Sequence, residues 1–208
     1  MSEKCRSASV RVCPNEDGRS DMEALRLFFL VMGGAMRFFW QRGAFEEAAE
    51  AYGRRDFVTA LRLCRPLAEK GHSGAQFRLG AMYFDGEGVT QNYSEALKWL
   101  RMAGDLGDGE AQVYLGFAHN NGKGVPLDHA EAVSWYRKAA EQNNAGGQAS
   151  LGAMYAQGLG VPQDGAEALR WLRKAADQGD ASAQCSLGAM YGLAAGGWLP
   201  AVLLGFVQ

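Results

Sequence analysis

The chain repeats itself with a fixed period of 36 residues over most of its length. Several residue types recur at this spacing: Gln76, Gln112, Gln148 and Gln184; Leu79, Leu115, Leu151 and Leu187; Gly80, Gly116, Gly152 and Gly188; Trp99, Trp135 and Trp171. Residues 71–106 and 143–178 are identical at 19 of 36 positions, which is far more than ordinary residue frequencies give by chance. Such self-similarity is typical of repeat proteins, in which each unit is one small supersecondary element.

Each unit is predicted to contain two helices. In the first unit, Leu79 and Tyr83 are spaced four apart, as on one helix face, and the same periodicity indicates a second helix at residues 93–105. Gly86 and Gly88 lie between them and favour backbone angles that end a helix. The predicted N-caps of the second helices are Asn92, Asp128 and Asp164. One helix pair cannot cover its own apolar side, so we expect the pairs to stack.

These motifs resemble the Sel1-like repeat family, a relative of the tetratricopeptide repeats. The resemblance covers about residues 44–191 and rests on Ala75, Gln76, Leu79, Gly80, Met82, Tyr83, Gly86, Gly88, Val89, Ala96, Trp99, Ala103 and their period mates. The second unit departs from the pattern at Ala118 and His119. The resemblance implies an all-α fold, an α-solenoid in which antiparallel helix pairs stack into a right-handed superhelix. It also implies a non-catalytic scaffold that binds a peptide or partner protein along its concave face.

The pattern divides the chain into three parts. The repeat domain is expected at residues 44–191, with a cap at 44–70, repeats at 71–106, 107–142 and 143–178, and a partial repeat at 179–191. Residues 1–43 are expected to be disordered apart from the apolar run Leu27–Met36, which suits either a signal-peptide core or an amphipathic helix. The apolar tail 192–208 suits a packed terminal helix, a membrane-associated segment or a truncated reading frame. The terminal segments therefore leave open whether the protein associates with a membrane, and whether it is exported to the periplasm or cytoplasmic.

The relationship to tetratricopeptide repeats implies that the first helix of each pair lines the concave face. The residues expected to be exposed there are Phe77, Ala81, Phe84 and Asp85, then Val113, Phe117, Asn120 and Asn121, then Ala149 and Gln157. Aromatic side chains beside short polar groups suit the recognition of a peptide. The alternative is that Phe77, Phe84 and Phe117 only pack between neighbouring units.

Composition and motif spacing argue against several other functions. A net charge of −2 disfavours nucleic-acid binding, which needs a basic surface. The cysteines lack the paired spacing of a zinc site, so neither a metal nor another cofactor is expected, and Cys64 and Cys185 are interpreted as small apolar helix residues. His119 takes the place of a repeat tyrosine and is expected to be packed. Gly122-Lys123-Gly124 closes a helix, whereas a phosphate-binding loop follows a strand.

An enzyme remains the alternative that the resemblance leaves open. Some family members are linked to penicillin binding or β-lactam hydrolysis, which implies a periplasmic β-lactam-binding protein or a cell-wall hydrolase. The nucleophile motif Ser-x-x-Lys is absent; Ser134, followed by Arg137 and Lys138, comes nearest. We therefore expect no catalytic residue and no enzymatic activity.

Overall fold

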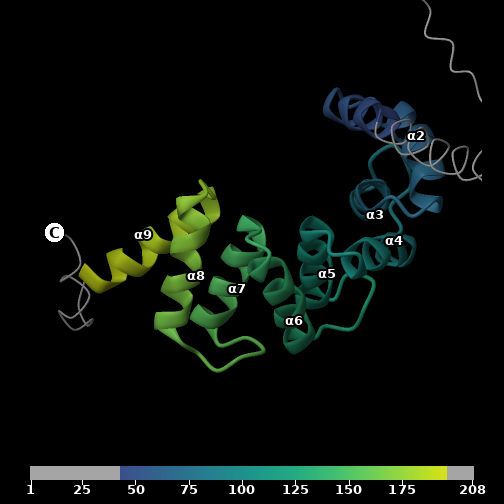
Figure 1. Cartoon of the computed structure of the whole chain (residues 1–208). Coiled ribbons are helices and arrows are strands. Elements are labelled where there is room, and N and C mark those ends of the chain that lie inside the picture. The colour runs from purple at the N-terminus through teal and green to yellow at the C-terminus, as the bar shows by residue number, and fades with distance from the viewer. Residues whose placement is uncertain (1–42, 196–208) are drawn as a thin grey trace, which may run out of the picture. The chain divides into compact units, whose positions relative to one another are not determined.

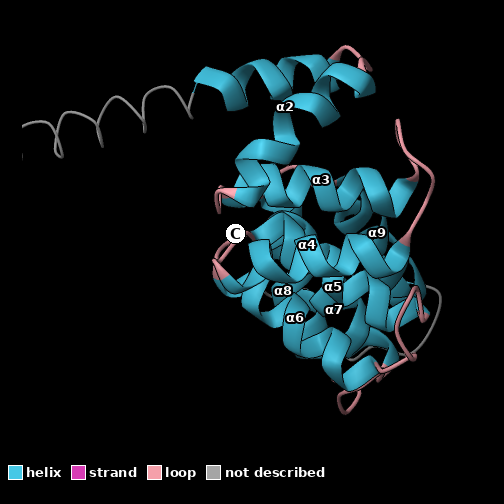
Figure 2. Cartoon of the chain, turned by 90° about the vertical axis from the view of Figure 1, so that its right-hand side faces the viewer, coloured by secondary structure: helices cyan, strands magenta, loops and turns pink. Residues whose placement is uncertain are grey.

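The computed structural model describes residues 43–195, and all regular structure in that range is α-helical, with no strand (Figures 1 and 2). Residues 43–53 are helical. They are followed by α2 (Phe57–Glu69), α3 (Ser73–Asp85), α4 (Tyr93–Asp105), α5 (Gly109–Asn121), α6 (His129–Glu141), α7 (Ala145–Gln157), α8 (Gly165–Asp177) and α9 (Ala181–Ala195). The expected all-α fold is therefore confirmed. The apolar run Leu27–Met36 and the tail from residue 196 onward lie outside the described residues.

Consecutive helices pack against one another along the chain, which makes the array a solenoid of helix pairs. The pairs α3–α4, α5–α6 and α7–α8 form repeats one, two and three, and α4, α6 and α8 each pack on the first helix of the next pair. The first helices α3, α5, α7 and α9 also contact one another in succession, whereas contacts between successive second helices are weaker or absent among the described residues. The first helices therefore lie on the inner side of the stack.

Capping residues set the ends of the helices as the sequence predicts. The side chain of each N-cap accepts a hydrogen bond from the backbone N–H of the third residue of its helix, with N–O distances of 3.0–3.1 Å. These N-caps are Asn92 of α4, Asp128 of α6 and Asp164 of α8. Each first helix of a repeat ends at a glycine in the left-handed region, such as Gly86 with φ of 76°. The left-handed residue turns the chain out of the helix and starts the loop to the second one.

The repeated glycine in the middle of each first helix allows the two helices of a pair to approach closely. A Cβ at Gly80 would lie 2.7 Å from the Leu100 side chain, which is too close for any real contact. Gly116 and Gly152 have the same relation to Tyr136 and Leu172. The side chain in contact with Gly80 belongs to Leu100, the residue that follows the repeated Trp99.

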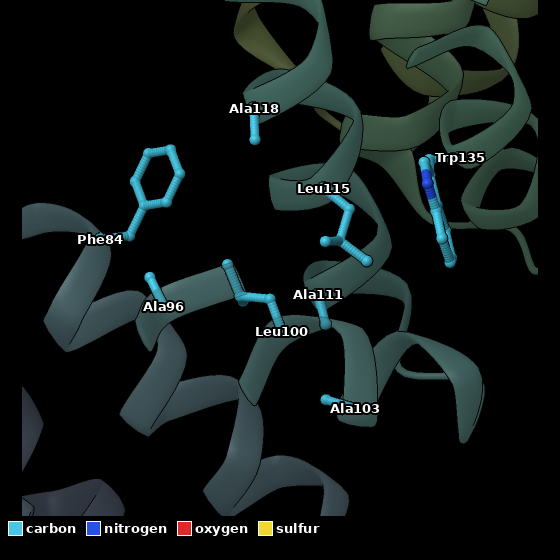
Figure 3. Packing of buried hydrophobic residues seen from close by; sticks show 8 residues of the cluster. All are labelled: Phe84, Ala96, Leu100, Ala103, Ala111, Leu115, Ala118 and Trp135. Atoms are coloured by element: carbon cyan, nitrogen blue, oxygen red, sulfur yellow. The ribbon is translucent and has the colours of Figure 1, made fainter. Parts of the chain in front are cut away.

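Separate hydrophobic clusters join each repeat to the next. Figure 3 shows one cluster to which two repeats contribute: Phe84, Ala96, Leu100, Ala103, Ala111, Leu115, Ala118 and Trp135. Leu100 and Leu115 are fully buried although they belong to different repeats. The stability of one repeat therefore depends on its neighbour, as expected for a stacked array.

A buried glutamine in each first helix links three helices by hydrogen bonds. Gln112 donates from Nε2 to the carbonyl oxygen of Gly104 in the preceding repeat, at 2.9 Å. Its Oε1 accepts from Gln142 Nε2, at 2.8 Å. The same arrangement occurs at Gln148, which donates to Ala140 and accepts from Gln178. In repeat one, Gln76 donates to Ala68, but the residue at the third position is Leu106, and Gln76 Oε1 is buried without a hydrogen-bond partner.

Leu106→Gln is expected to raise the free energy of unfolding by about 1 kcal/mol, because the new amide completes the bond that Gln76 Oε1 lacks. Leu106 is 62% exposed, so little burial is lost. Urea denaturation followed by circular dichroism measures the change. Leu106→Glu is the matched control, since it has the same shape but no N–H to donate; an equal gain in both variants would contradict the explanation.

The described helices include none that is both long and apolar enough to cross a membrane.

Candidate functional site

The inner side of the first helices carries the residues that the sequence assigns to partner binding, but not all of them are exposed. Ala81, Phe84 and Ala149 are buried, with 3%, 5% and 7% of their surface exposed. Their expected exposure is wrong: Phe84 packs on Tyr114 and Phe117 of α5, and Ala149 belongs to a cluster with residues of α8 and α9. Phe84 belongs to the shared core of repeats one and two.

Phe84 is the centre of an aromatic cluster between the first two repeats. Its ring meets those of Tyr93, Tyr114 and Phe117 edge-on, at centroid distances of 5.0, 5.4 and 6.1 Å. Phe77 contacts Tyr114 in the same way at 5.7 Å. These rings come from α3, α4 and α5, so the cluster holds the two repeats together.

Phe117 is the one member of this cluster that is exposed, with 44% of its surface in contact with solvent. The same position in the other first helices is occupied by alanine: Ala81, Ala153 and Ala189. Repeat two therefore places a large aromatic ring where the stack needs only a methyl group. We define the inner face as Phe77, Asp85, Glu87, Tyr114 and Phe117.

Two tyrosines donate hydrogen bonds to the two carboxylates of the inner face. Tyr114 Oη donates to Asp85 Oδ2 at 3.1 Å, and Tyr52 Oη donates to Glu87 Oε2 at 2.5 Å. Burial raises the pKa of Tyr52 to about 12, and the bond to Glu87 adds to the shift. Burial and Asp85 likewise raise the pKa of Tyr114. Both hydroxyls therefore stay protonated and keep donating at any physiological pH.

Within the described residues, neither Asp85 nor Glu87 forms an ion pair. Partial burial raises the pKa of Asp85, which the bond from Tyr114 opposes and the charge of Glu87 reinforces. The nearby Arg78 guanidinium lies instead over the rings of Tyr52 and Phe45, at 5.1 and 5.8 Å from their centroids. The inner face thus combines apolar rings with negative charge that no cation of the described chain neutralises.

The remaining expected residues differ in their availability. Asn120 Oδ1 contacts His129 Nδ1 at 2.9 Å, and Asn121 donates from its side chain to the carbonyl oxygen of Phe117 at 2.9 Å. Both amides are therefore used within repeat two. Val113 is half-buried against repeat three, and Gln157 is exposed at the end of α7.

Sequence reasoning missed Tyr52, Tyr114 and Glu87. Tyr114 stands at the position of Arg78 and Ser150 in the neighbouring repeats. An alignment of the three repeats would therefore have shown it as an unusual aromatic residue. The bond from Tyr52 to Glu87 joins residues 35 positions apart. Such a pairing depends on how the cap helix packs on repeat one, which no local pattern reveals.

Within residues 43–195, the histidine side chains that could serve in catalysis or metal binding do not converge. His72 caps α3, accepting from the N–H of Ala75 at 3.3 Å, whereas His119 is buried in α5. The described part of the chain contains no group of three His, Cys, Asp or Glu side chains that could hold a metal ion. Cys64 is buried as expected, but Cys185 is exposed, because no further first helix covers that side of α9 in the described range.

A family model described as Sel1 repeat matches three consecutive segments of the chain, residues 73–108, 109–144 and 145–180. Together the matched segments make up half of the chain. Their boundaries coincide with the helix pairs α3–α4, α5–α6 and α7–α8.

Two solved structures resemble the chain in both sequence and fold. The first is a protective antigen of uropathogenic Escherichia coli strains that displays an SLR fold; it is 37% identical with a TM-score of 0.68, over 74% of this chain and 34% of the antigen. The second is a Sel1 repeat protein from Oxalobacter formigenes; it is 39% identical with a TM-score of 0.55, over 61% of this chain and 95% of that protein.

A curated relative is the exopolysaccharide production negative regulator of Rhizobium leguminosarum bv. viciae, which is 44% identical over 57 residues. The match covers 27% of this chain and 17% of the regulator. This chain thus spans about a third of the antigen's length and about a sixth of the regulator's.

Proposed function

This chain belongs to the Sel1 repeat family, and from that premise we propose that it is a non-catalytic scaffold for protein–protein interaction. We infer that a partner binds as an extended segment along the inner face of repeats one and two. The expected groove residues Phe77, Asp85 and Phe117 are retained in this proposal, while Phe84 and Ala81 support them from below. Val113 and Gln157 would extend the contact toward repeat three.

The observation that carries the proposal is the exposure of Phe117. The ring leaves 44% of its surface in water, so only part of it packs within the stack, and alanine suffices at this position in the other repeats. Aromatic residues, Phe included, are enriched in the cores of protein–protein interfaces, where a few residues carry most of the binding energy. Phe117 rests on the ring of Phe84, so it is held in place before a partner arrives, which lowers the entropy cost of binding.

The negative charge of the inner face indicates which kind of side chain the partner carries next to its apolar residue. Asp85 and Glu87 lack an ion pair among the described residues, and Tyr52 and Tyr114 fix the orientation of both carboxylates. A basic side chain of the partner would neutralise them. We therefore propose a segment that carries an apolar residue for Phe117 next to lysine or arginine.

Affinity capture with the full chain as bait, read by mass spectrometry, tests the function. For a partner found in this way, Phe117→Ala is expected to weaken binding about tenfold. Asp85→Asn is expected to weaken binding less and to reduce its salt dependence. Isothermal titration at two salt concentrations measures both effects.

Met102→Ala is the matched control, because Met102 is 47% exposed but lies on α4, a second helix. The affinity of the Met102→Ala variant for the partner should stay within about twofold of the affinity of the unchanged chain. If Phe117→Ala and Met102→Ala weaken binding equally, or if neither does, the partner does not use the inner face.

A further inference from the structure

Helix α4 exposes apolar side chains on the outer side of the stack, where the second helices of the other two repeats expose polar ones. Met102 and Leu106 are 47% and 62% exposed, and the residues at these positions in repeats two and three are lysine and glutamine. Trp99, one turn before Met102, is half-buried. Spacings of three and four residues place these side chains on one side of the helix. We call Trp99, Met102 and Leu106 the α4 stripe.

The tryptophans of the other two repeats are shielded from solvent by lysine. Lys138 Nζ lies 3.8 Å from the ring centroid of Trp135, and Lys174 Nζ lies 4.6 Å from that of Trp171. Both tryptophans are buried, with 5% and 8% of their surface exposed. The lysine stem covers the ring and its charged end faces water. Met102 takes the place of this lysine in α4, so repeat one presents an apolar surface there instead of a charge.

Leu106 lowers the stability of repeat one. In repeat two, Gln142 at this position donates to Gln112 Oε1, whereas Gln76 Oε1 is buried without a hydrogen-bond partner. An unpaired buried acceptor is unfavourable, and most of the leucine side chain gains nothing from burial. Residues that break the local rules of a fold without stabilising it are expected at functional surfaces.

Two charged residues beside the stripe make this surface complementary to itself. Lys98 and Asp105 are seven residues apart, so they lie on the same side of α4, about two turns from each other. In a two-fold symmetric contact, residue i of one copy meets residue j of the other, and j meets i. If two α4 helices pack antiparallel with Met102 at the axis, Trp99 of each copy meets Leu106 of the other. The same register places each Lys98 opposite Asp105 of the other copy.

Both charged side chains are available for such a contact. Asp105 is exposed and forms no ion pair within the described residues. Lys98 donates to Glu95 Oε2 on its own helix at 3.1 Å, and its side chain is 67% exposed. An exposed ion pair of this kind contributes little to stability, so a second carboxylate from another copy can share the lysine at little cost.

We propose that the chain forms a two-fold symmetric dimer through the α4 stripe. One helix from each copy gives a small interface, so the dimer is weak, with a dissociation constant on the order of 10–100 µM. The stripe lies on a second helix, whereas the first helices carry the inner face. The dimer therefore leaves the inner face free and does not depend on the function proposed above. Met102→Ala weakens the dimer but not the binding of a partner to the inner face.

Sedimentation velocity of the full chain at roughly 1–500 µM is expected to show a monomer–dimer equilibrium. The double variant Met102→Lys/Leu106→Gln, which gives α4 the residues of α6 at these positions, should weaken the dimer at least about tenfold. It should melt no lower than the unchanged chain, because the new amide pairs with Gln76 Oε1. Leu127→Gln is the matched control, since Leu127 is 61% exposed and glutamine stands at its position in the other repeats. This variant should dimerise like the unchanged chain.

An exchange of charge tests the antiparallel register. Lys98→Asp and Asp105→Lys should each weaken the dimer about tenfold, because like charges then face each other across the axis. An equimolar mixture of the two variants should associate as tightly as the unchanged chain, because each contact across the axis again joins opposite charges. Residues 98 and 105 are too far apart on one helix to pair with each other, so recovery in the mixture comes only from contact between copies.

The proposal fails if the unchanged chain stays monomeric throughout this concentration range. Self-association that persists undiminished in the Met102→Lys/Leu106→Gln variant would place the contact on another surface. A mixture of the two charge variants that stays monomeric would exclude the antiparallel register. None of these outcomes bears on partner binding at the inner face, which affinity capture tests separately.

Discussion

Gly160→Ala is expected to lower the free energy of unfolding by about 3 kcal/mol. Gly160 lies in the loop of repeat three with φ of 69°, and a left-handed residue with a side chain costs about 1–2 kcal/mol. Its Cβ would also meet the backbone of the preceding repeat, at the carbonyl group of His129 and 2.8 Å from the N atom of Ala130. Helix α6 begins at His129, so its backbone cannot move aside without shifting the repeat.

Gly179→Ala is the matched control for this prediction. Gly179 also has a positive φ, of 88°, but nothing lies within 4 Å of its Cβ position. Its substitution should cost only the conformational part, about 1 kcal/mol. Urea denaturation of the two variants, followed by circular dichroism, separates conformational strain from the contact between repeats. Equal losses of stability would show that the loop of repeat three does not press on α6.

The contact at Gly160 explains why the second glycine of the loop recurs. Gly88 and Gly124 have the same relation to Phe57 and Tyr93, the first residues of α2 and α4, with Cβ distances of 2.5 Å. Each loop therefore rests on the start of the second helix in the preceding pair. The 36-residue spacing indicated that these glycines have a structural role, and we interpreted them from the sequence as residues that end the first helix. The contact between repeats is a property of the stack and is invisible within one repeat.

The sequence predicted the fold far better than the candidate site. Helix ends at Gly86 and Asn92 follow from local chemistry that three copies repeat, so periodicity alone located them. Exposure on the inner face depends instead on the neighbouring repeat. Phe84 and Phe117 look alike in the sequence, yet one is 5% and the other 44% exposed, because α5 covers the first and nothing described covers the second.

Departures from the repeat pattern were a better guide to the site than the pattern itself. Tyr114, Phe117, Leu106 and His119 all differ from their period mates, and all lie in or beside repeats one and two. Two of them leave buried polar groups without partners, at Gln76 Oε1 and at the His119 ring. Among the described residues, the buried polar groups without hydrogen-bond partners thus lie in the repeats that carry the proposed inner face, as expected if partner binding there competes with stability.

The second large effect is expected at His119, where a contact found at the other repeat junctions is missing. At those junctions an arginine of a second helix donates to the tyrosine hydroxyl 18 residues later: Arg65 to Tyr83, Arg137 to Tyr155 and Arg173 to Tyr191. The corresponding pair in repeats one and two is Arg101 and His119. His119 is 9% exposed, and neither ring nitrogen has a hydrogen-bond partner.

His119→Tyr is therefore expected to raise the free energy of unfolding by about 2 kcal/mol, because it removes two unsatisfied buried nitrogens and gives Arg101 an acceptor. A double-mutant cycle isolates the second contribution. Arg101→Ala should leave the stability of the unchanged chain within about 0.5 kcal/mol and should cost the His119→Tyr variant about 1 kcal/mol. Urea denaturation of the unchanged chain, the two single variants and the double variant gives the four free energies of unfolding that the cycle needs. A His119→Tyr variant that is less stable than the unchanged chain would show that the histidine is held by its packing, and that the junction of repeats one and two has a geometry of its own.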